Sequence, residues 1–200
     1  MGAQPQRKYE FDEPTIHVDW TLAFSRTENG KARAYWDSLR GERIMPARSE
    51  LSPRGMREFL THVNLVDVCP GSGRESIDYM VTLQGSHGSE VFGPLARRKF
   101  SAGLSEVTAR RLRECLTLAR DSARPVRISS RVTGGDKFWL DSESFIAPLG
   151  DEAGCVTAIM WNFVSWRAVA VLLETGAPPR RPVCWTTKNR SRSIIYLARA

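Results

Sequence analysis

Residues 36–68, WDSLRGERIMPARSELSPRGMREFLTHVNLVDV, place two helix signals directly before an apolar strand. Gly41 stands where a helix commonly ends, because glycine adopts left-handed backbone angles at little cost. Ser52 followed by Pro53 is typical of an N-cap and a first helical residue. The apolar run at 63–68 then predicts a strand that enters a core. The stretch contains no evident nucleophile, metal ligand or phosphate-binding loop, so it informs about fold more than about chemistry.

Outward from this stretch, the spacing of apolar residues predicts further elements. Strict alternation from Ile77 to Leu83 indicates a strand in a sheet that is wet on one face. The longest predicted helix, 105–123, has an apolar side, while Arg110, Arg111, Arg113 and Arg120 face away. No element is predicted before Trp20. In chain order the sequence predicts helices over 32–40 and near 56–60, strands over 62–69 and 77–83, helices over 86–92 and 105–123, strands over 126–132, 138–148 and 155–164, and a last helix over 166–175.

This order fits an α+β fold in which a five-stranded antiparallel sheet is covered by helices on one face. Glycine-containing turns between successive strands favour hairpins. Here the chain resembles the PAS domain, and within it a subfamily of short bacterial single-domain PAS proteins. The resemblance covers residues 32–166, preceded by an extension, 1–31, and followed by a helix and basic tail, 167–200. It is carried by Trp36, Leu39-Arg40-Gly41, Met45-Pro46-Ala47-Arg48, Asp67-Val68, Leu83-Gln84-Gly85-Ser86 and Val91-Phe92-Gly93.

The resemblance implies a ligand held between the inner face of the sheet and the helices. Apolar side chains predicted on that side are the candidate ligand-binding residues, although the same side chains would also form an ordinary core. These candidates are Tyr79, Val81, Leu83, Phe92, Leu112, Leu116, Phe145 and Trp161.

A second candidate site lies around the first predicted helix. Tyr35 and Trp36 are aromatic residues of the kind that anchor interfaces, and we expect them at a dimer or partner surface. Arg40, Arg43 and Arg48 surround Pro46 and could bind a carboxylate, a phosphate or an acidic partner. The alternative is ordinary pairing with nearby acidic residues, which outnumber these arginines.

Cofactor chemistry finds little support in the sequence. His87 would be the haem ligand if the protein held haem, but it lies in a turn of small residues and we do not expect it to bind iron. A flavin adduct needs a cysteine that 85–93 lacks. The histidines are too dispersed for a metal site, and Asp141, Glu143, Ser142 and Ser144 alternate as on a solvated outer face. No catalytic residue is predicted.

Much of the excess positive charge of the chain lies in the C-terminal tail and not in the domain. The chain of 200 residues has a net charge of +7, and the last 21 residues contribute six basic side chains and no acidic one. Trp185 among these arginines could stack a base, so a nucleic-acid-associated protein is the alternative function. The four cysteines form no CxxC pair, and Cys184 is the one that we expect a thiol reagent to reach.

The sequence therefore predicts a non-enzymatic sensory or adaptor protein in bacterial signal transduction. We expect it to be cytoplasmic, because the chain has no signal peptide and no apolar run long enough for a membrane span. Its output would be association, either as a homodimer or with a signalling protein, in response to a small molecule.

Overall fold

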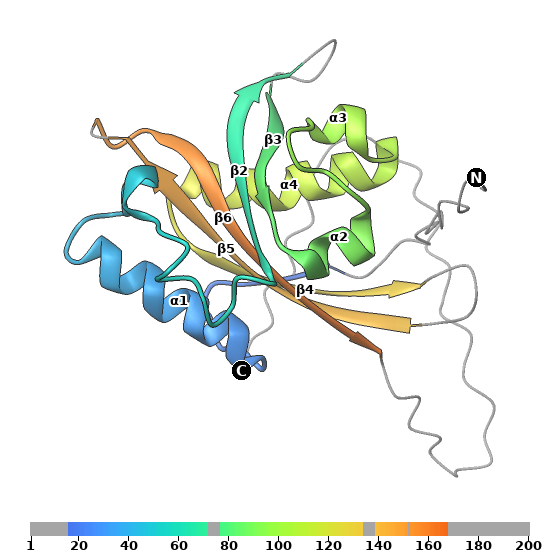
Figure 1. Ribbon diagram of the computed structural model, residues 1–200, viewed down its shortest axis with the longest axis horizontal. Coiled ribbons are helices and arrows are strands. Elements are labelled where there is room, and N and C mark those ends of the chain that lie inside the picture. The colour runs from blue at the N-terminus through green and yellow to red at the C-terminus, as the bar shows by residue number, and fades with distance from the viewer. Residues whose placement is uncertain (1–15, 72–76, 134–138, 152, 168–200) are drawn as a thin grey trace, which may run out of the picture.

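The computed structural model describes residues 16–71, 77–133, 139–151 and 153–167. A six-stranded antiparallel sheet with the strand order β1-β4-β5-β6-β2-β3 forms its centre (Figure 1). The strands are β1 Ile16–Asp19, β2 Val63–Pro70, β3 Ile77–Gln84, β4 Val126–Thr133, β5 Trp139–Gly150 and β6 Val156–Arg167. The five predicted strands are β2 to β6, with small differences at their ends. The hairpin between the first two is also confirmed, since β2 pairs with β3.

The sixth strand, β1, lies where the sequence predicts no element, so the prediction of five strands was wrong. It pairs with β4 through four residues, with Ile16 opposite Ser130 and Asp19 opposite Arg127. A four-residue edge strand is too short to show a periodic pattern. Its pairing partner lies more than 100 positions along the chain, and pairing at that distance is invisible to local spacing.

The helices are α1 Thr27–Arg40, α2 Ser86–Phe92, α3 Phe100–Gly103 and α4 Glu106–Ser122, with a 3₁₀ helix, η1, over Arg48–Glu50. Ser105 caps α4 by accepting a hydrogen bond from the Thr108 backbone N–H. Gly93, with φ of 76°, ends α2 in a conformation that favours glycine. The sequence predicts α2 and α4 closely, begins α1 later than the structure does and misses α3.

Residues 53–62 form consecutive turns, so the predicted second helix was wrong. The Ser52 hydroxyl does cap the segment by accepting from the Gly55 N–H at 3.2 Å. The Phe59 and His62 N–H groups, however, donate to carbonyls only three residues earlier. This pattern folds the chain back without extending a helix, and it brings Met56 and Phe59 into the core.

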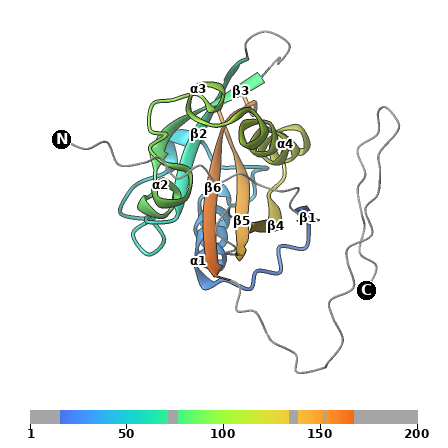
Figure 2. The ribbon, with the colours of Figure 1, turned by 90° about the vertical axis from the view of Figure 1, so that its right-hand side faces the viewer.

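Helices cover both faces of the sheet, which corrects the prediction that they cover one. On the inner face α2, α3 and α4 enclose a core that includes Tyr79, Leu116 and Trp161. On the outer face α1 and the turns that precede β2 enclose a second core with Trp36 and Phe145. Figure 2 shows α1 and α4 at separate positions around the sheet. The last predicted helix was wrong at its start, because Trp166 and Arg167 belong to β6, and its remainder lies outside the described residues.

Glu143 of β5 fixes the N-terminus of α1 on the outer face. It is fully buried and accepts hydrogen bonds from the backbone N–H groups of Ser25 and Arg26, each at 3.0 Å, and from Asn29 Nδ2. Arg127 completes the site, with Nη2 at 2.8 Å. Burial disfavours the ionised carboxylate and by itself would raise the pKa of Glu143. The hydrogen bonds from Ser25, Asn29 and Arg127 have the larger combined effect and lower that pKa. The prediction that Glu143 lies on a solvated face was wrong, because these partners come from distant segments.

A β-bulge in β3 changes which face its side chains occupy. Leu65 of β2 lies opposite Leu83, whereas the next residue, Val66, lies opposite Val81, so Thr82 is an extra residue. Val81 therefore packs in the inner core and Leu83 against the outer one. Strict alternation had placed both on the inner face.

Candidate ligand-binding cavity

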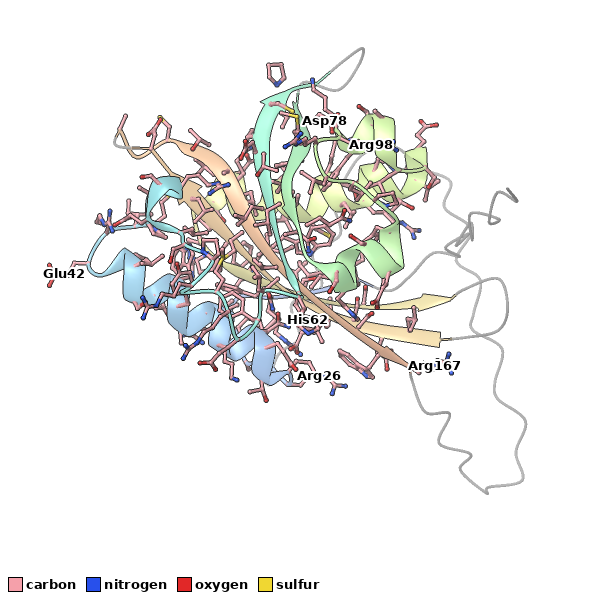
Figure 3. All side chains as sticks on the ribbon, in the orientation of Figure 1. Arg26, Glu42, His62, Asp78, Arg98 and Arg167 are labelled. Carbon is pink, nitrogen blue, oxygen red and sulfur yellow. The ribbon has the colours of Figure 1, made fainter. Side chains whose placement is uncertain are left out.

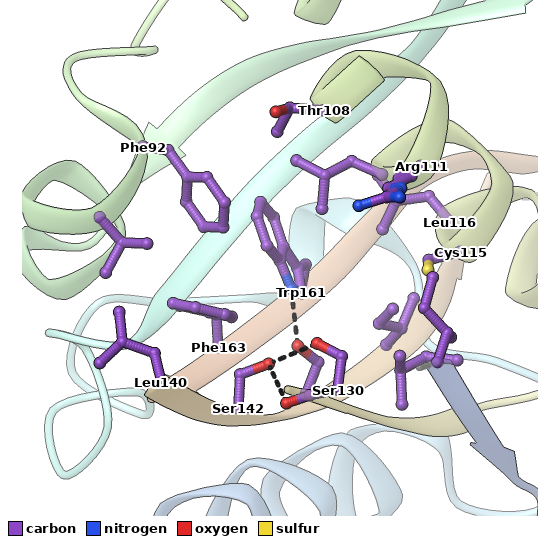
Figure 4. A pocket seen from close by; sticks show the side chains of 16 residues that line it. Phe92, Thr108, Arg111, Cys115, Leu116, Ser130, Leu140, Ser142, Trp161 and Phe163 are labelled. Atoms are coloured by element: carbon purple, nitrogen blue, oxygen red, sulfur yellow. Dashed lines mark hydrogen bonds between the residues drawn. The ribbon is translucent and has the colours of Figure 1, made fainter. Parts of the chain in front are cut away.

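A cavity of about 90 Å³ lies between the inner face of the sheet and the helices α2 and α4 (Figure 4). Its apolar wall includes the rings of Phe92, Trp161 and Phe163, which contact one another with centroids 5.0–5.7 Å apart. The other lining residues are Ile16, Val91, Thr108, Arg111, Leu112, Cys115, Leu116, Ile128, Ser130, Leu140, Ser142, Ser144 and Ile146. The residues that line the cavity thus belong to β1, α2, α4, β4, β5 and β6.

Three serines form the polar part of the cavity floor. Ser130 and Ser142 face each other from β4 and β5, with their hydroxyl oxygens 2.8 Å apart. Ser144 accepts a hydrogen bond from Trp161 Nε1 at 3.1 Å, which fixes the indole ring against the sheet. The sequence places Ser142 and Ser144 on a solvated face, but both are buried. They were misassigned because serines interrupt the apolar pattern that marks an inner face, although Ile146 continues the same face two residues later.

Arg111 of α4 is the one charged residue among the described residues that line the cavity. Its Nη1 atom is buried and has no hydrogen-bond partner among the described residues. Figure 4 shows Arg111 on the helical side, across the Trp161 ring from Ser130 and Ser142. The prediction that Arg111 faces away from the sheet was wrong. Arginines that recur along one helix are typical of a solvated face, and only the position of the sheet identifies those that turn inward. Arg113 is also largely buried, with its Nη1 3.8 Å from Asp78 Oδ1.

Four of the eight candidate ligand-binding residues line the cavity: Phe92, Leu112, Leu116 and Trp161. Tyr79 and Val81 belong to the same inner core without lining the cavity. The Tyr79 hydroxyl lies 3.0 Å from Thr117 Oγ1, and burial raises the pKa of the phenol, against the effect of that hydrogen bond.

Leu83 and Phe145 lie on the other side of the sheet, in or against the outer core. Leu83 is turned there by the bulge at Thr82. Phe145 alternates with the cavity-lining Ser144 and Ile146, so its ring points outward and contacts Phe24 edge-on, with centroids 5.5 Å apart. Their placement in a pocket on the inner face was wrong.

Trp36 is 2% exposed, and its Nε1 donates to the Pro148 carbonyl at 2.9 Å. It anchors α1 to the outer face of the sheet and is not available as a partner surface, which corrects the prediction. Tyr35 is partly exposed, and its hydroxyl accepts from the Ser52 N–H at 3.0 Å. The pair was misjudged because an amphipathic helix packs its aromatic side equally well on a sheet or on a partner.

The three arginines near Pro46 have partners within the chain. Arg43 binds Glu50 and the Leu39 carbonyl, and the carbonyl of Arg43 itself accepts from Arg40. Arg48 lies 3.9 Å from an Asp67 oxygen. Ordinary pairing, the alternative weighed for these residues, is thus what the structure contains. Glu42, next to them in the chain, extends away from the surface (Figure 3).

His87 is held as a neutral imidazole. Its Nε2 accepts a hydrogen bond from the Ser165 backbone N–H at 3.0 Å and lies 3.0 Å from the Ser165 hydroxyl. Burial, and then the neighbouring His62 ring 4.8 Å away, lower the pKa of His87. The nitrogen that would bind haem iron is engaged in these contacts. Within the described residues, no group of three histidine, cysteine or acidic side chains is arranged to hold a metal ion.

A polar hollow of about 460 Å³ lies near the N-terminus of α1 and includes His17, Ser25, Ser129 and Trp166. The guanidinium of Arg26 lies over the Trp166 ring, 3.5 Å from its centroid. The buried carboxylate of this hollow, Glu143, is already saturated by the contacts with α1 described above. The inner-face cavity is therefore the better candidate for a ligand.

A protein-family model described as the PAS domain matches residues 25–161. The chain belongs to the PAS domain family. PAS domains are generally sensory or signalling modules, and this one places its cavity between the sheet and α4. No curated protein matches the chain. None of the described helices is both long and apolar enough to cross a membrane. The tail proposed for nucleic acid, and Cys184 within it, lie outside the described residues.

Proposed function

We propose that this protein is a short, non-enzymatic bacterial PAS protein that senses a small molecule in its inner-face cavity. The cavity itself is the observation that carries the proposal. It combines three aromatic rings in mutual, tilted contact with a few polar groups at fixed positions, which is the composition of small-molecule sites in general. The LRG and MPAR motifs support the assignment to the short bacterial subfamily.

The strands that line the cavity offer a route for the signal. On β5, Ser144 and Ile146 face the cavity while Phe145 and Ala147 contact the outer core beneath α1. A ligand that shifts β5 or β6 on one face would therefore disturb the packing of α1 on the other, because packed cores transmit small displacements. We propose that the output is a change in association, with a second copy of this chain or with another signalling protein.

Filling the cavity tests the proposal. Ser142→Leu places a larger side chain in the space that a ligand would occupy, and Ser38→Leu, at an exposed position of α1, is the matched control. Native mass spectrometry of the purified proteins, followed by small-molecule identification after denaturation, reports a bound compound. A screen of metabolites by thermal shift then covers a ligand lost during purification.

We expect a compound that binds the parent protein and Ser38→Leu but not Ser142→Leu. Equal binding to all three proteins would overturn the cavity as the site. Failure of every compound to bind or to stabilise the parent protein would overturn the proposal of sensing. For the output, light scattering with and without the compound should show a change in oligomeric state, or hydrogen exchange should show altered protection in α1.

A further inference from the structure

We propose that the ligand of the cavity is a small monocarboxylate with an aromatic body, and that Arg111 binds its carboxylate. This inference rests on the proposed function, because it assigns a chemical class to the ligand of the same cavity. It depends on three features of the site: an unpaired cation, an aromatic wall and a limited volume.

The charge of Arg111 has no partner within the described residues. Its Nη1 is buried without an acceptor, and none of the described residues that line the cavity is acidic. A buried donor that loses its bonds to water is unfavourable until an acceptor is supplied, and a charged donor more so. Arg110, on the same helix, is exposed. The remaining two arginines have acidic partners, Asp78 for Arg113 and Asp121 for Arg120. The site is thus completed by an anion.

A single guanidinium favours a carboxylate over a more highly charged anion. Carboxylates and guanidinium groups match in shape and form paired hydrogen bonds. A phosphate carries up to two negative charges, and the described lining residues offer one cation. Ser144 adds a further polar contact, because its oxygen accepts from Trp161 Nε1 and its own hydroxyl hydrogen has no acceptor among the described residues.

The rest of the wall fits an apolar ring. Phe92, Trp161 and Phe163 present ring faces and edges to the cavity, and aromatic pairs are stabilised beyond simple burial. A volume of about 90 Å³ corresponds to roughly six to nine water-sized positions. Benzoate is close to this size, whereas a long-chain fatty acid is far larger.

The experiment compares benzoate with benzamide, a neutral analogue of nearly the same shape, by titration calorimetry and by ligand-observed NMR. Arg111→Gln removes the charge, and Arg110→Gln is the matched control on the exposed side of the same helix. We expect benzoate to bind the parent protein and Arg110→Gln equally, and Arg111→Gln about 10- to 100-fold more weakly. Benzamide should bind all three proteins alike and more weakly than benzoate binds the parent protein. Thermal unfolding of Arg111→Gln checks that the variant remains folded.

The outcomes separate this inference from the proposed function. If benzamide binds the parent protein as tightly as benzoate does, or if Arg111→Gln leaves benzoate binding unchanged, the carboxylate assignment is wrong while the cavity still binds small molecules. If Ser142→Leu leaves benzoate binding unchanged, the anion binds elsewhere, and the assignment to this cavity is wrong. In a further outcome, neither probe binds, but another class of compound binds the parent protein and not Ser142→Leu. That result would support small-molecule sensing in the cavity and would show that the assignment to an aromatic monocarboxylate is wrong.

Discussion

Glu143 of β5 and Arg127 of β4 form an ion pair, with Oε1 and Nη2 2.8 Å apart, in which the carboxylate is fully buried. The same carboxylate satisfies two backbone N–H groups at the start of α1, which has no side-chain cap of its own. A residue of the sheet therefore supplies both the charge and the hydrogen bonds that favour a helix N-terminus.

Replacement of Glu143 by Gln should lower the free energy of unfolding by about 3 kcal/mol, because it leaves Arg127 without its buried partner. Since the folded-state pKa of Glu143 lies below its ordinary value, its contribution is present above about pH 4.3 and is lost as the pH falls through the folded pKa. Urea denaturation at pH 7 and at pH 3 should show this loss in the parent protein and not in Glu143→Gln. Glu42→Gln, at an exposed position, should match the parent protein at both pH values.

Trp36 tests whether α1 is held by packing or by a partner. Trp36→Phe removes the hydrogen bond to the Pro148 carbonyl but keeps a ring in the core, so we expect a loss of about 1 to 3 kcal/mol in the free energy of unfolding. Trp36→Ala should lose about 3 to 5 kcal/mol. Tyr35→Phe, at a partly exposed position, is the control and should change stability by less than about 1 kcal/mol. A change in oligomeric state of folded Trp36→Phe, with stability intact, would contradict a purely internal role.

The bulge in β3 predicts that deletion of Thr82 is tolerated better than deletion of a paired residue of the same strand. Thr82→Ala removes a hydrogen bond from the exposed hydroxyl to the Leu65 carbonyl and should cost about 1 kcal/mol or less. Deletion of Thr82 would leave Val81 and Leu83 on the opposite faces that they already occupy. Deletion of Met80, which lies opposite Asp67, would turn the residues that follow it to the other face and should destabilise the protein by more than about 3 kcal/mol. Chemical denaturation compares the substitution and the two deletions. Equal loss of stability in the two deletions would contradict the assignment of Thr82 as the extra residue.

His87 should make the protein less stable in mild acid. Its folded-state pKa lies below 6.5, so the unfolded chain binds the proton more readily and stability falls as the pH drops below about 6.5. Protonation of Nε2 would remove its bond from the Ser165 N–H. His87→Gln keeps an acceptor at this position, so its urea midpoint should change less than that of the parent protein between pH 7.5 and 5.5. His17→Gln should retain the full dependence of the parent protein.

Thiol labelling should follow burial. Burial raises the pKa of Cys115 to about 12, so about one thiol in ten thousand is ionised at pH 8. Cys155 is exposed and should react with iodoacetamide well before Cys115, which lines the cavity. Peptide mass spectrometry after a timed reaction gives the order. Early modification of Cys115 in folded protein would show that the cavity opens widely to solvent.

Sequence periodicity predicts the elements that depend on local spacing. An apolar run identifies β2, alternation identifies β3, and the turns between successive strands help to identify β4 to β6. The apolar side of α4 identifies the longest helix. The errors occur where distant residues determine the local structure. Glu143 is buried because Ser25, Asn29 and Arg127 surround it, and β1 is a strand because β4 provides its partner.

The sequence predicts only part of the cavity lining, because distant residues also decide which side chains face the cavity. Large apolar residues on the inner face were correctly assigned where the strands and helices are regular, as for Trp161 and Leu116. The polar lining was missed, because Ser144 and Arg111 belong to patterns that usually face solvent. A search for small polar residues in register with an inner-facing residue such as Ile146 could have found the serines.

The short strand β1 also limits the unpaired sheet edge that the domain offers to other chains. An unpaired edge strand offers a row of backbone N–H and C=O groups to any other chain, and β1 covers that row on β4. A chain shortened to begin at α1 would leave β4 at the margin of the sheet. Such a chain would be open to intermolecular strand addition and aggregation, so the residues before α1 belong in any truncated form made for crystallisation or binding studies.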